Sequence, residues 1–375
     1  MDIKRKLEIL SEDSQYDLAC SCGTPKDGHR KKSSDGKWLY PVPLPQGGYS
    51  ILLKTLLSNA CANDCKYCPL RSDSNITRCT IKADETARLF MDYYRKRAVH
   101  GVFLSSGVID TPDRTMQLIT DTAALIRRNP EAKKAFIHLK VIPGCSEAAV
   151  EEALRYSNAI SLNIETPGER HFRNLSAKKN YESDIIRLLK FISSSTGPGT
   201  EHPKTKCSTQ FIVGASDEKD SEIINYTFGI YERLKFKRVY FSAYQQGLGK
   251  PGFAGEDKFS LSSDADRLTR EHRLYQADFL IRKYGFAKED MIFSNDGNFS
   301  LEKDPKLIWA ENNQSLFPVD INRATAETLL RVPGLGPELT ARIIKLRQIH
   351  RIRELADIGL KGKNLQKTAP WIKFI

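Results

Sequence analysis

Three cysteines stand close together in one short stretch of the sequence, CANDCKYC, at positions Cys61, Cys65 and Cys68. Cysteine thiolates hold the irons of a [4Fe-4S] cluster, one thiolate to each iron. Three cysteines therefore bind three irons and leave the fourth open to a small molecule, as a catalytic zinc site keeps one position open. This spacing predicts an iron–sulfur cluster whose fourth ligand comes from a bound molecule rather than from the protein.

A structural zinc ion is the alternative interpretation of the same cysteines. Zinc would need a fourth protein ligand, such as Cys79 or a histidine, to close a tetrahedral site. Structural zinc ligands usually come as paired knuckles on a small module, whereas these cysteines directly follow a segment with the pattern of a buried strand. The sequence favours the cluster and leaves zinc as the alternative.

The rest of the composition is ordinary for a globular protein of 375 residues, with 40% hydrophobic and 28% charged residues. No apolar run approaches the roughly 18 residues of a membrane span, and the charged N-terminus does not read as a signal peptide. We therefore expect a cytoplasmic protein whose eight cysteines do not form a disulfide framework. The net charge of +12 favours a polyanionic partner, although solubility alone is the simpler explanation of such a charge.

Short apolar segments alternate with longer amphipathic ones between residues 49 and 244. The strand candidates are residues 49–59, 101–107, 135–142, 159–166, 208–215 and 238–244, and the helix candidates include residues 84–99, 146–157 and 221–236. The tripeptide Thr111-Pro112-Asp113 indicates another helix start, with a capping hydroxyl, a proline and an acid in the first turn. Strands that are apolar on both faces and are followed by helices indicate a parallel sheet. Six such units predict an α/β fold, a partial (β/α)6 barrel with its chemistry at the C-terminal ends of the strands.

The chain divides into four parts by composition. We expect an N-terminal extension over residues 1–48, the barrel over residues 49–260, linker helices over residues 261–317 and a small all-α domain over residues 318–375. The extension holds Cys20 and Cys22, which we interpret as free thiols, with ligands of a second cluster as the alternative. The remaining cysteines are expected to be ordinary small residues, most of them buried: Cys79, Cys145 and Cys207.

A glycine-rich turn joins two short helical segments near the C-terminus, in the stretch VPGLGPELTARII. Gly334 and Gly336 let the backbone turn tightly and expose N–H groups at the start of the next helix, where a phosphate can bind without any reading of base sequence. This stretch resembles the helix-hairpin-helix motif of DNA-binding and repair proteins. Thr340 stands where that family usually has alanine, and residues 356–367 resemble a second, weaker copy of the hairpin.

Positive charge is concentrated in the same C-terminal part. Residues 318–375 contain 11 lysines and arginines and 5 acids, a net charge of +6, which is half of the charge of the whole chain. Arg342, Lys345 and Arg347 fall on the helix after the hairpin, where they are placed to follow a phosphate backbone. The expected nucleic-acid contacts are thus these three residues with Gly334 and Gly336. A packing or dimerisation module with a basic surface is the alternative.

The CxxxCx(aromatic)C arrangement after the first strand of a (β/α) domain resembles the radical S-adenosylmethionine (SAM) superfamily. The resemblance implies that the amino and carboxylate groups of SAM bind the open iron. An electron from the reduced cluster, which an electron donor must supply, then cleaves SAM to a 5′-deoxyadenosyl radical that abstracts hydrogen from a substrate. The cofactor carries this chemistry, while the protein positions it and excludes water.

The resemblance also assigns contacts to SAM at the ends of the second and third strands. Ser105, Ser106 and Gly107 stand where family members have a Gly-Gly-Glu-like turn that binds the methionine amino group. Glycine at such a turn permits a close backbone approach. Lys140 ends the third strand and is a candidate for the cofactor carboxylate, with a solvated surface lysine as the alternative.

Further contacts are implied on the fourth and fifth strands and beside the last cysteine. Asn163 and Glu165 lie two residues apart and so point to one face of their strand, where similar enzymes contact the ribose and methionine of SAM. Tyr67 matches an aromatic residue that packs near the adenine. Ile212 and Gly214 match part of a GxIxGxxE turn near the adenine. Two other positions of that turn are filled by Gln210, in place of the first glycine, and Asp217, in place of the acid.

Five segments together resemble a family of radical SAM proteins described as acting in DNA modification or repair: SNACANDCKYC, LSSGVID, HLKVIPG, REHRLYQADFL and LLRVPGLG. This resemblance extends over nearly the whole chain. It implies a DNA substrate. It also implies a uracil-DNA-glycosylase-like partner protein, because members of the family are often encoded with one.

The leading hypothesis is a radical SAM enzyme that uses a [4Fe-4S] cluster and SAM to modify or repair nucleic acid, with DNA as the expected substrate. An RNA-modifying enzyme is the nearest alternative, because a phosphate-binding hairpin need not distinguish the two polymers. A non-catalytic iron–sulfur protein that binds DNA or senses redox state is an alternative from another class. A small-molecule radical enzyme with a docking tail is a third. No residue stands out as a catalytic hydrogen donor.

Overall fold

The computed structural model describes residues 1–14, 38–43, 48–253, 255–256 and 263–375. Two compact units divide the chain, one of residues 1–218 and 229–268 and the other of residues 219–228 and 269–375. The expectation for Cys20 and Cys22 lies outside the described residues. Within the described part, no helix is long and apolar enough to cross a membrane.

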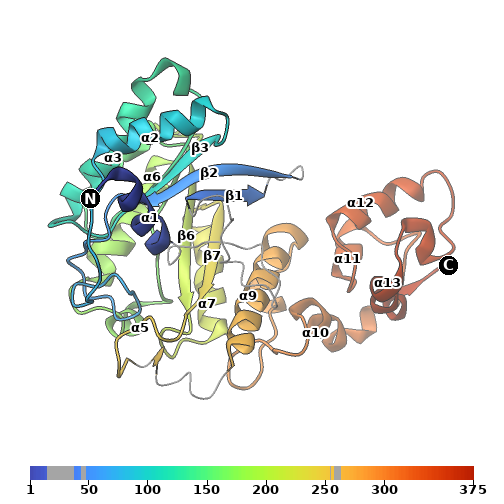
Figure 1. Ribbon diagram of the computed structural model, residues 1–375. Coiled ribbons are helices and arrows are strands. Elements are labelled where there is room, and N and C mark those ends of the chain that lie inside the picture. The colour runs from blue at the N-terminus through green and yellow to red at the C-terminus, as the bar shows by residue number, and fades with distance from the viewer. Residues whose placement is uncertain (15–37, 44–47, 254, 257–262) are drawn as a thin grey trace. The chain divides into compact units, whose positions relative to one another are not determined.

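A seven-stranded sheet forms the centre of the first unit, with its strands in sequence order from β1 to β7. The strands are β1 (Leu39–Pro43), β2 (Tyr49–Leu56), β3 (Gly101–Ser105), β4 (Phe136–Lys140), β5 (Ala159–Ser161), β6 (Lys206–Val213) and β7 (Arg238–Ala243). Strands β2 to β7 are parallel and curl into a half-barrel (Figure 1), which confirms the predicted partial barrel of six βα units. Strand β1, which falls within residues 1–48, adds an antiparallel edge strand.

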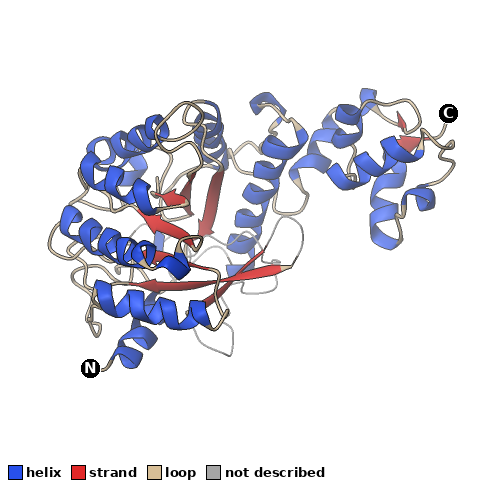
Figure 2. Ribbon diagram, turned by 90° about the horizontal axis from the view of Figure 1, so that it is seen from above, coloured by secondary structure: helices blue, strands red, loops and turns tan. Residues whose placement is uncertain are grey.

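Helices connect the parallel strands, and α2 (Ala83–Arg95), α3 (Pro112–Arg128), α4 (Glu147–Tyr156) and α6 (Arg187–Ser195) lie along the outer side of the curled sheet (Figure 2). The short helix α5 (Glu169–Arg173) follows β5, α7 (Asp220–Glu232) follows β6 and contains residues of both units, and α1 (Ile3–Asp13) precedes β1. The predicted start of α3 is confirmed, because the Thr111 side chain accepts a hydrogen bond from the Arg114 N–H. The Ser146 side chain caps α4 in the same way.

Strands β4 and β7 bury one face more completely than the other. In β4, Ile137 and Leu139 are fully buried, whereas His138 and Lys140 are half-buried, and β7 alternates in the same way. The expectation of strands apolar on both faces is therefore wrong for β4 and β7. Apolar side chains pack beneath the outer helices, while polar side chains line the concave face. This polar lining leads to the carboxyl ends of the strands, where the predicted site residues lie.

The second unit contains the C-terminal part of α9 (Asp264–Tyr284), together with α10 (Pro305–Asn312), α11 (Ala326–Arg331), α12 (Pro337–Leu346) and α13 (Gly362–Thr368). Its core is a cluster of aliphatic side chains that includes Leu329, Leu335, Ile343, Ile358 and Leu360. The expectation of an all-α domain needs one correction, since the two-residue strands β8 (Val319–Asp320) and β9 (Ile372–Lys373) pair in parallel.

Two turns of the second unit share one backbone conformation. Gly334 has φ +86° and Gly359 has φ +80°, a left-handed conformation that favours glycine. The next residue of each turn, Leu335 or Leu360, is buried at 1% and 4% exposure. Gly336 and Lys361 then adopt extended conformations as the N-caps of α12 and α13. The segment expected to be a weaker second copy of the hairpin thus has the same turn conformation, although a 3-10 helix (Leu355–Ile358) precedes its turn.

Candidate active site and nucleic-acid interface

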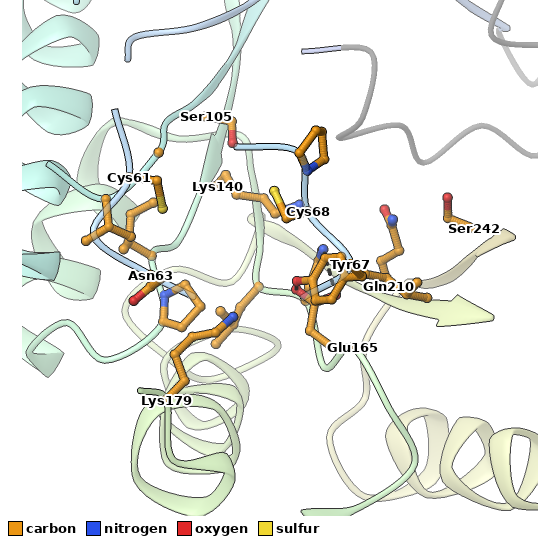
Figure 3. Close-up of a pocket in the computed structure, with 18 of the residues that line it drawn as sticks. Cys61, Asn63, Tyr67, Cys68, Ser105, Lys140, Glu165, Lys179, Gln210 and Ser242 are labelled. Carbon is orange, nitrogen blue, oxygen red and sulfur yellow. Dashed lines mark hydrogen bonds between the residues drawn. The ribbon is translucent and has the colours of Figure 1, made fainter. Parts of the chain in front are cut away.

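A pocket opens at the carboxyl ends of the parallel strands of the first unit (Figure 3). Two of the predicted cluster ligands, Cys61 and Cys68, lie on its wall. Eight of the nine predicted SAM contacts also line it: Tyr67, Ser105, Ser106, Gly107, Lys140, Asn163, Glu165 and Ile212. The fold therefore brings side chains from the loop after β2 and from every later parallel strand to one place.

The three cysteines lie together in the loop after β2, at and beside the wall of this pocket. Cys65 is 7% exposed, and burial raises the pKa of the Cys65 and Cys68 thiols, so a metal must displace their protons. A [4Fe-4S] cluster binds each sulfur to a different iron, whereas a structural zinc ion would need a fourth protein ligand beside these three thiols.

The cysteine loop is held from one side by the segment after α5. The Asp64 carboxylate accepts hydrogen bonds from Ser176 Oγ at 2.5 Å and from the backbone N–H groups of Ala177 at 2.9 Å and Lys178 at 3.3 Å. Burial by itself would raise the pKa of Asp64, but these hydrogen bonds hold it below its usual value. Lys178 Nζ also donates to the Ala62 carbonyl at 2.7 Å. These contacts hold the cysteine loop against the segment after α5.

Arginine side chains hold the other end of the cysteine loop. The Arg78 guanidinium donates to the carbonyls of Asn59, Leu70, Arg71 and Ser74. Arg71 Nη1 donates to the carbonyl of Cys68 at 3.2 Å and to that of Leu248 at 3.0 Å, which ties the loop after β7 to the last cysteine. Since Leu248 lines the pocket, this contact places one of its walls.

A buried carboxylate faces the cysteines from the segment after β5, because β5 ends at Ser161 and Asn163 and Glu165 lie beyond the strand on which they were expected. Glu165 is 5% exposed, its backbone has φ +67°, and its carboxylate accepts hydrogen bonds from Tyr67 Oη at 3.0 Å and from Asn163 Nδ2 at 3.4 Å. Burial raises the pKa of Glu165, while the ammonium groups of Lys179 and Lys140 oppose that rise. A strained backbone that persists beside such contacts is typical of a functional site. The group can accept hydrogen bonds from hydroxyls of a bound molecule.

Lys179 is a pocket residue that sequence reasoning missed. Its side chain points into the pocket from the segment after α5 (Figure 3), where it lies within hydrogen-bonding reach of Cys65. Burial by itself would lower the pKa of Lys179, but the charges that Cys65 and Glu165 carry when ionised raise it. Nothing in the sequence SAKKN distinguishes it from Lys178. The sequence assigned no role to several other residues of the pocket lining, among them Asn63, Ser242, Tyr244, Gln245 and Leu248.

The turn after β6 differs from the expected motif by one residue. Gly214 does not line the pocket, and its N–H donates to Glu218 Oε1 at 2.5 Å. Ser216 donates to the same carboxylate through its N–H and its hydroxyl. Asp217, which stands at the acid position of the motif, instead contacts His171 and Arg170. Glu218 is therefore the acid that closes this turn.

The predicted nucleic-acid contacts on α12 differ in how free their side chains are. Lys345 is exposed. Arg342 Nη1 donates to the Ile358 carbonyl at 3.0 Å, and Arg347 Nη1 donates to the Ala324 carbonyl at 2.6 Å. Both arginines thus also hold the motif together. The Thr340 hydroxyl is buried without a hydrogen-bond partner within the described part of the chain.

Comparisons with known proteins bear on both units. Residues 55–226 match the model of the Radical SAM superfamily, and residues 316–373 match that of the helix-hairpin-helix motif. No curated protein matched the chain. Similar solved structures include HydG, a maturase of the [FeFe]-hydrogenase, at 13% identity and a TM-score of 0.46, over 59% of this chain and 49% of that one.

Two further solved structures are similar at the same level. Methylornithine synthase (PylB) matches at 16% identity and a TM-score of 0.43, over 60% of this chain and 63% of that one. The maturase HydG from Carboxydothermus hydrogenoformans matches at 16% identity and a TM-score of 0.45, over 60% of this chain and 50% of that one. The matched region thus spans less than two thirds of each of these structures. The chain therefore contains a radical SAM superfamily domain over residues 55–226 and a helix-hairpin-helix motif over residues 316–373.

Proposed function

We propose that the chain is a radical SAM enzyme that modifies or repairs nucleic acid, with DNA as its substrate. One observation carries the proposal: a pocket lined by the cysteine motif of a radical SAM domain and a hairpin with a glycine turn occur in a single chain. The first feature supplies the chemistry, and the second supplies affinity for a phosphate backbone.

Different residues in and beside the pocket hold the cluster and SAM. Cys61, Cys65 and Cys68 would hold the cluster, which together with bound SAM would supply the radical chemistry that removes hydrogen from a substrate. Glu165, which Tyr67 and Asn163 orient, accepts hydrogen bonds from the ribose hydroxyls. The small side chains of Ser105 and Ser106, with Gly107, leave room for the methionine amino group.

Two lysines offer positive charge to the carboxylate of SAM. Lys140 comes from the end of β4, and Lys179 comes from the segment after α5. Apolar pocket residues exclude water from the reacting centre, as radical chemistry requires. These are Val141, Ile142, Pro143, Leu162, Ile212 and Leu248.

The second unit binds the phosphate backbone of the nucleic-acid substrate. Gly334 and Gly336 frame the N-terminus of α12, where free N–H groups and the helix dipole attract a phosphate. Exposed Lys345 on α12 adds charge, and Arg342 and Arg347 contribute their remaining N–H groups. We further propose an electron donor and a uracil-DNA-glycosylase-like protein as partners, on the resemblance alone.

The pocket fits a non-catalytic iron–sulfur protein less well than it fits an enzyme. A structural cluster needs a fourth protein ligand, and no further cysteine or histidine belongs to the described lining of this pocket. An open iron beside a pocket instead leaves room for SAM.

The test is made without oxygen, on the full chain with its cluster reconstituted. SAM and a strong reductant are added, and 5′-deoxyadenosine is quantified with duplex DNA, single-stranded DNA, RNA or no polymer. We expect 5′-deoxyadenosine to form and duplex or single-stranded DNA to stimulate it. Stimulation by RNA alone would identify an RNA-modifying enzyme. No product from an intact cluster would overturn the enzymatic proposal.

A further inference from the structure

A buried lysine contacts the hairpin turn from outside the matched motif. Lys306, in α10, is 8% exposed, and its Nζ donates a hydrogen bond of 2.5 Å to the carbonyl oxygen of Leu335. The same Nζ lies 4.6 Å from the centroid of the Tyr284 ring. Lysines are almost never so buried without a paired acid. Its single carbonyl partner is therefore a feature that needs an explanation.

The charged and titratable groups around Lys306 come from four elements. Asp304 attracts its ammonium group, but Asp304 Oδ2 already accepts from Lys367 Nζ at 2.5 Å. Lys367 and Arg331 repel it, and the Tyr284 phenol covers it from α9. Burial, the largest effect, lowers the pKa of Lys306 to about 7. The side chain is thus an ammonium group below that pH and a neutral amine above it.

The carbonyl that Lys306 contacts belongs to the peptide between Leu335 and Gly336. In a trans peptide the C=O and the N–H point in opposite directions. The Gly336 N–H therefore points away from Lys306, and it has no backbone acceptor within the described residues. A positive donor on the oxygen draws electron density through the peptide and makes the opposite N–H a stronger donor.

We propose that Lys306 is a positioning residue of the phosphate site: it fixes and polarises the Leu335–Gly336 peptide from behind, so that the Gly336 N–H is directed at a phosphate of the nucleic acid. This inference rests on the proposed function of the hairpin. Lys306 does not touch the phosphate in this arrangement. Replacing Lys306 should therefore weaken binding to nucleic acid. The salt dependence of binding should stay the same, because the number of cations released from the nucleic acid does not change.

The proposal also couples binding to pH. The ammonium form is the better donor to the Leu335 carbonyl, so binding weakens as Lys306 loses its proton above about pH 7. A bound phosphate in turn favours the protonated lysine, since the linkage is reciprocal. Other groups of the unit titrate nearby, among them His272, whose pKa burial lowers. The difference between wild type and a Lys306 variant isolates the contribution of Lys306.

The first experiment measures binding of the full chain to a short DNA duplex by fluorescence anisotropy, over a series of salt concentrations and from about pH 6 to about pH 9. Lys306→Met keeps the length of the side chain and removes its charge, while Lys306→Arg keeps the charge. We expect Lys306→Met to weaken binding about tenfold at low pH, with the same salt slope and without the pH dependence of wild type. Lys306→Arg should recover part of the loss.

Two lysine variants serve as controls. Lys303→Met removes an exposed lysine that pairs with Glu311, and it should bind like wild type. Lys345→Met removes a proposed phosphate contact, so it should weaken binding and reduce the salt slope by about one. If Lys345→Met weakens binding while Lys306→Met does not, the inference is overturned and the hairpin assignment stands. If neither changes the binding of wild type, the hairpin assignment itself fails.

A second measurement needs no nucleic acid. The amide resonance of Gly336 in the deuterated, ¹⁵N-labelled full chain should shift with pH, with a midpoint near 7. In Lys306→Met this titration should disappear. A Gly336 resonance that is the same at all pH values in wild type would overturn the polarisation of the peptide, whatever the DNA measurements show.

Discussion

The hydroxyl of Tyr67 donates a hydrogen bond of 3.0 Å to the carboxylate of Glu165 across the pocket that both residues line. Tyr67 lies directly before Cys68 of the cysteine motif, and Glu165 lies in the segment that follows β5. The Tyr67 ring also packs against the buried cluster of Leu175, Ala215, Tyr244 and Phe253. One side chain thus joins the cysteine loop to the polar wall of the site.

Tyr67→Phe tests whether this hydrogen bond orients Glu165 for SAM. The phenylalanine keeps the ring packing but leaves the buried carboxylate with one donor fewer. We expect about a tenfold weaker affinity for SAM, with normal iron content. Isothermal titration of the reconstituted protein with SAM measures the first and metal analysis the second. Wild-type affinity for SAM would show that the bond only packs the loop.

Cys65→Ala tests whether cleavage of SAM and binding of DNA are independent functions of the two units. Loss of one thiolate should abolish the cluster and all cleavage of SAM, while affinity for DNA stays as in wild type because the hairpin has its own core. Iron content, 5′-deoxyadenosine formation and anisotropy with a DNA duplex measure the three properties. An equal loss of DNA binding would mean that the cluster supports the second unit.

Cys79→Ala is the matched control for that variant. Cys79 is half-buried outside the cysteine trio, and it is the cysteine that a closed zinc site would recruit. We expect its substitution to leave iron content and SAM cleavage unchanged. Loss of the metal from Cys79→Ala, with zinc in the wild-type protein, would support the zinc interpretation instead.

The elements of the fold were predictable from local patterns. Each parallel strand was predicted from its apolar segment, and the start of α3 followed from the capping chemistry of Thr111. Strand β1 was missed because Pro41 and Pro43 interrupt its pattern, although prolines are tolerated on an edge strand. The burial of alternate residues in β4 and β7 depends on how the sheet curls, which the sequence does not state.

The side chains that complete both sites were not predictable in the same way. Lys178 and Lys179 are adjacent and chemically identical, yet the first donates to the Ala62 carbonyl and the second enters the pocket. Only the packing of their segment on the cysteine loop distinguishes them. Lys306 was missed for a related reason, because a lysine in a polar stretch is normally a surface residue. A sequence motif thus indicates the residues that bind a cofactor or a phosphate, but not the residues that position them.

Thr340→Val should stabilise the second unit. The Thr340 hydroxyl is buried without a partner in the described structure, and an unsatisfied buried polar group costs about 1 to 3 kcal/mol. Valine has the same shape, so we expect the free energy of unfolding to rise by about 1 kcal/mol. Thr368→Val is the matched control, because that buried hydroxyl donates to the Asn364 carbonyl at 2.9 Å and its removal should destabilise. Urea denaturation compares the two, and a destabilised Thr340→Val would show that the hydroxyl has an acceptor in solution.

Lys306 should make the stability of the second unit depend on pH. Burial lowers its pKa from 10.5 to about 7, so between these values the unfolded chain binds more protons than the folded chain. The free energy of unfolding should therefore rise as the pH increases from about 7 to about 10.5, and the penalty for burying the charge is fully present below about pH 7. Urea denaturation at several pH values measures this slope. Lys306→Met should lack it and should unfold at a higher urea concentration than wild type at low pH. A variant that is less stable than wild type at every pH would mean that the ammonium group stabilises the turn by more than its burial costs.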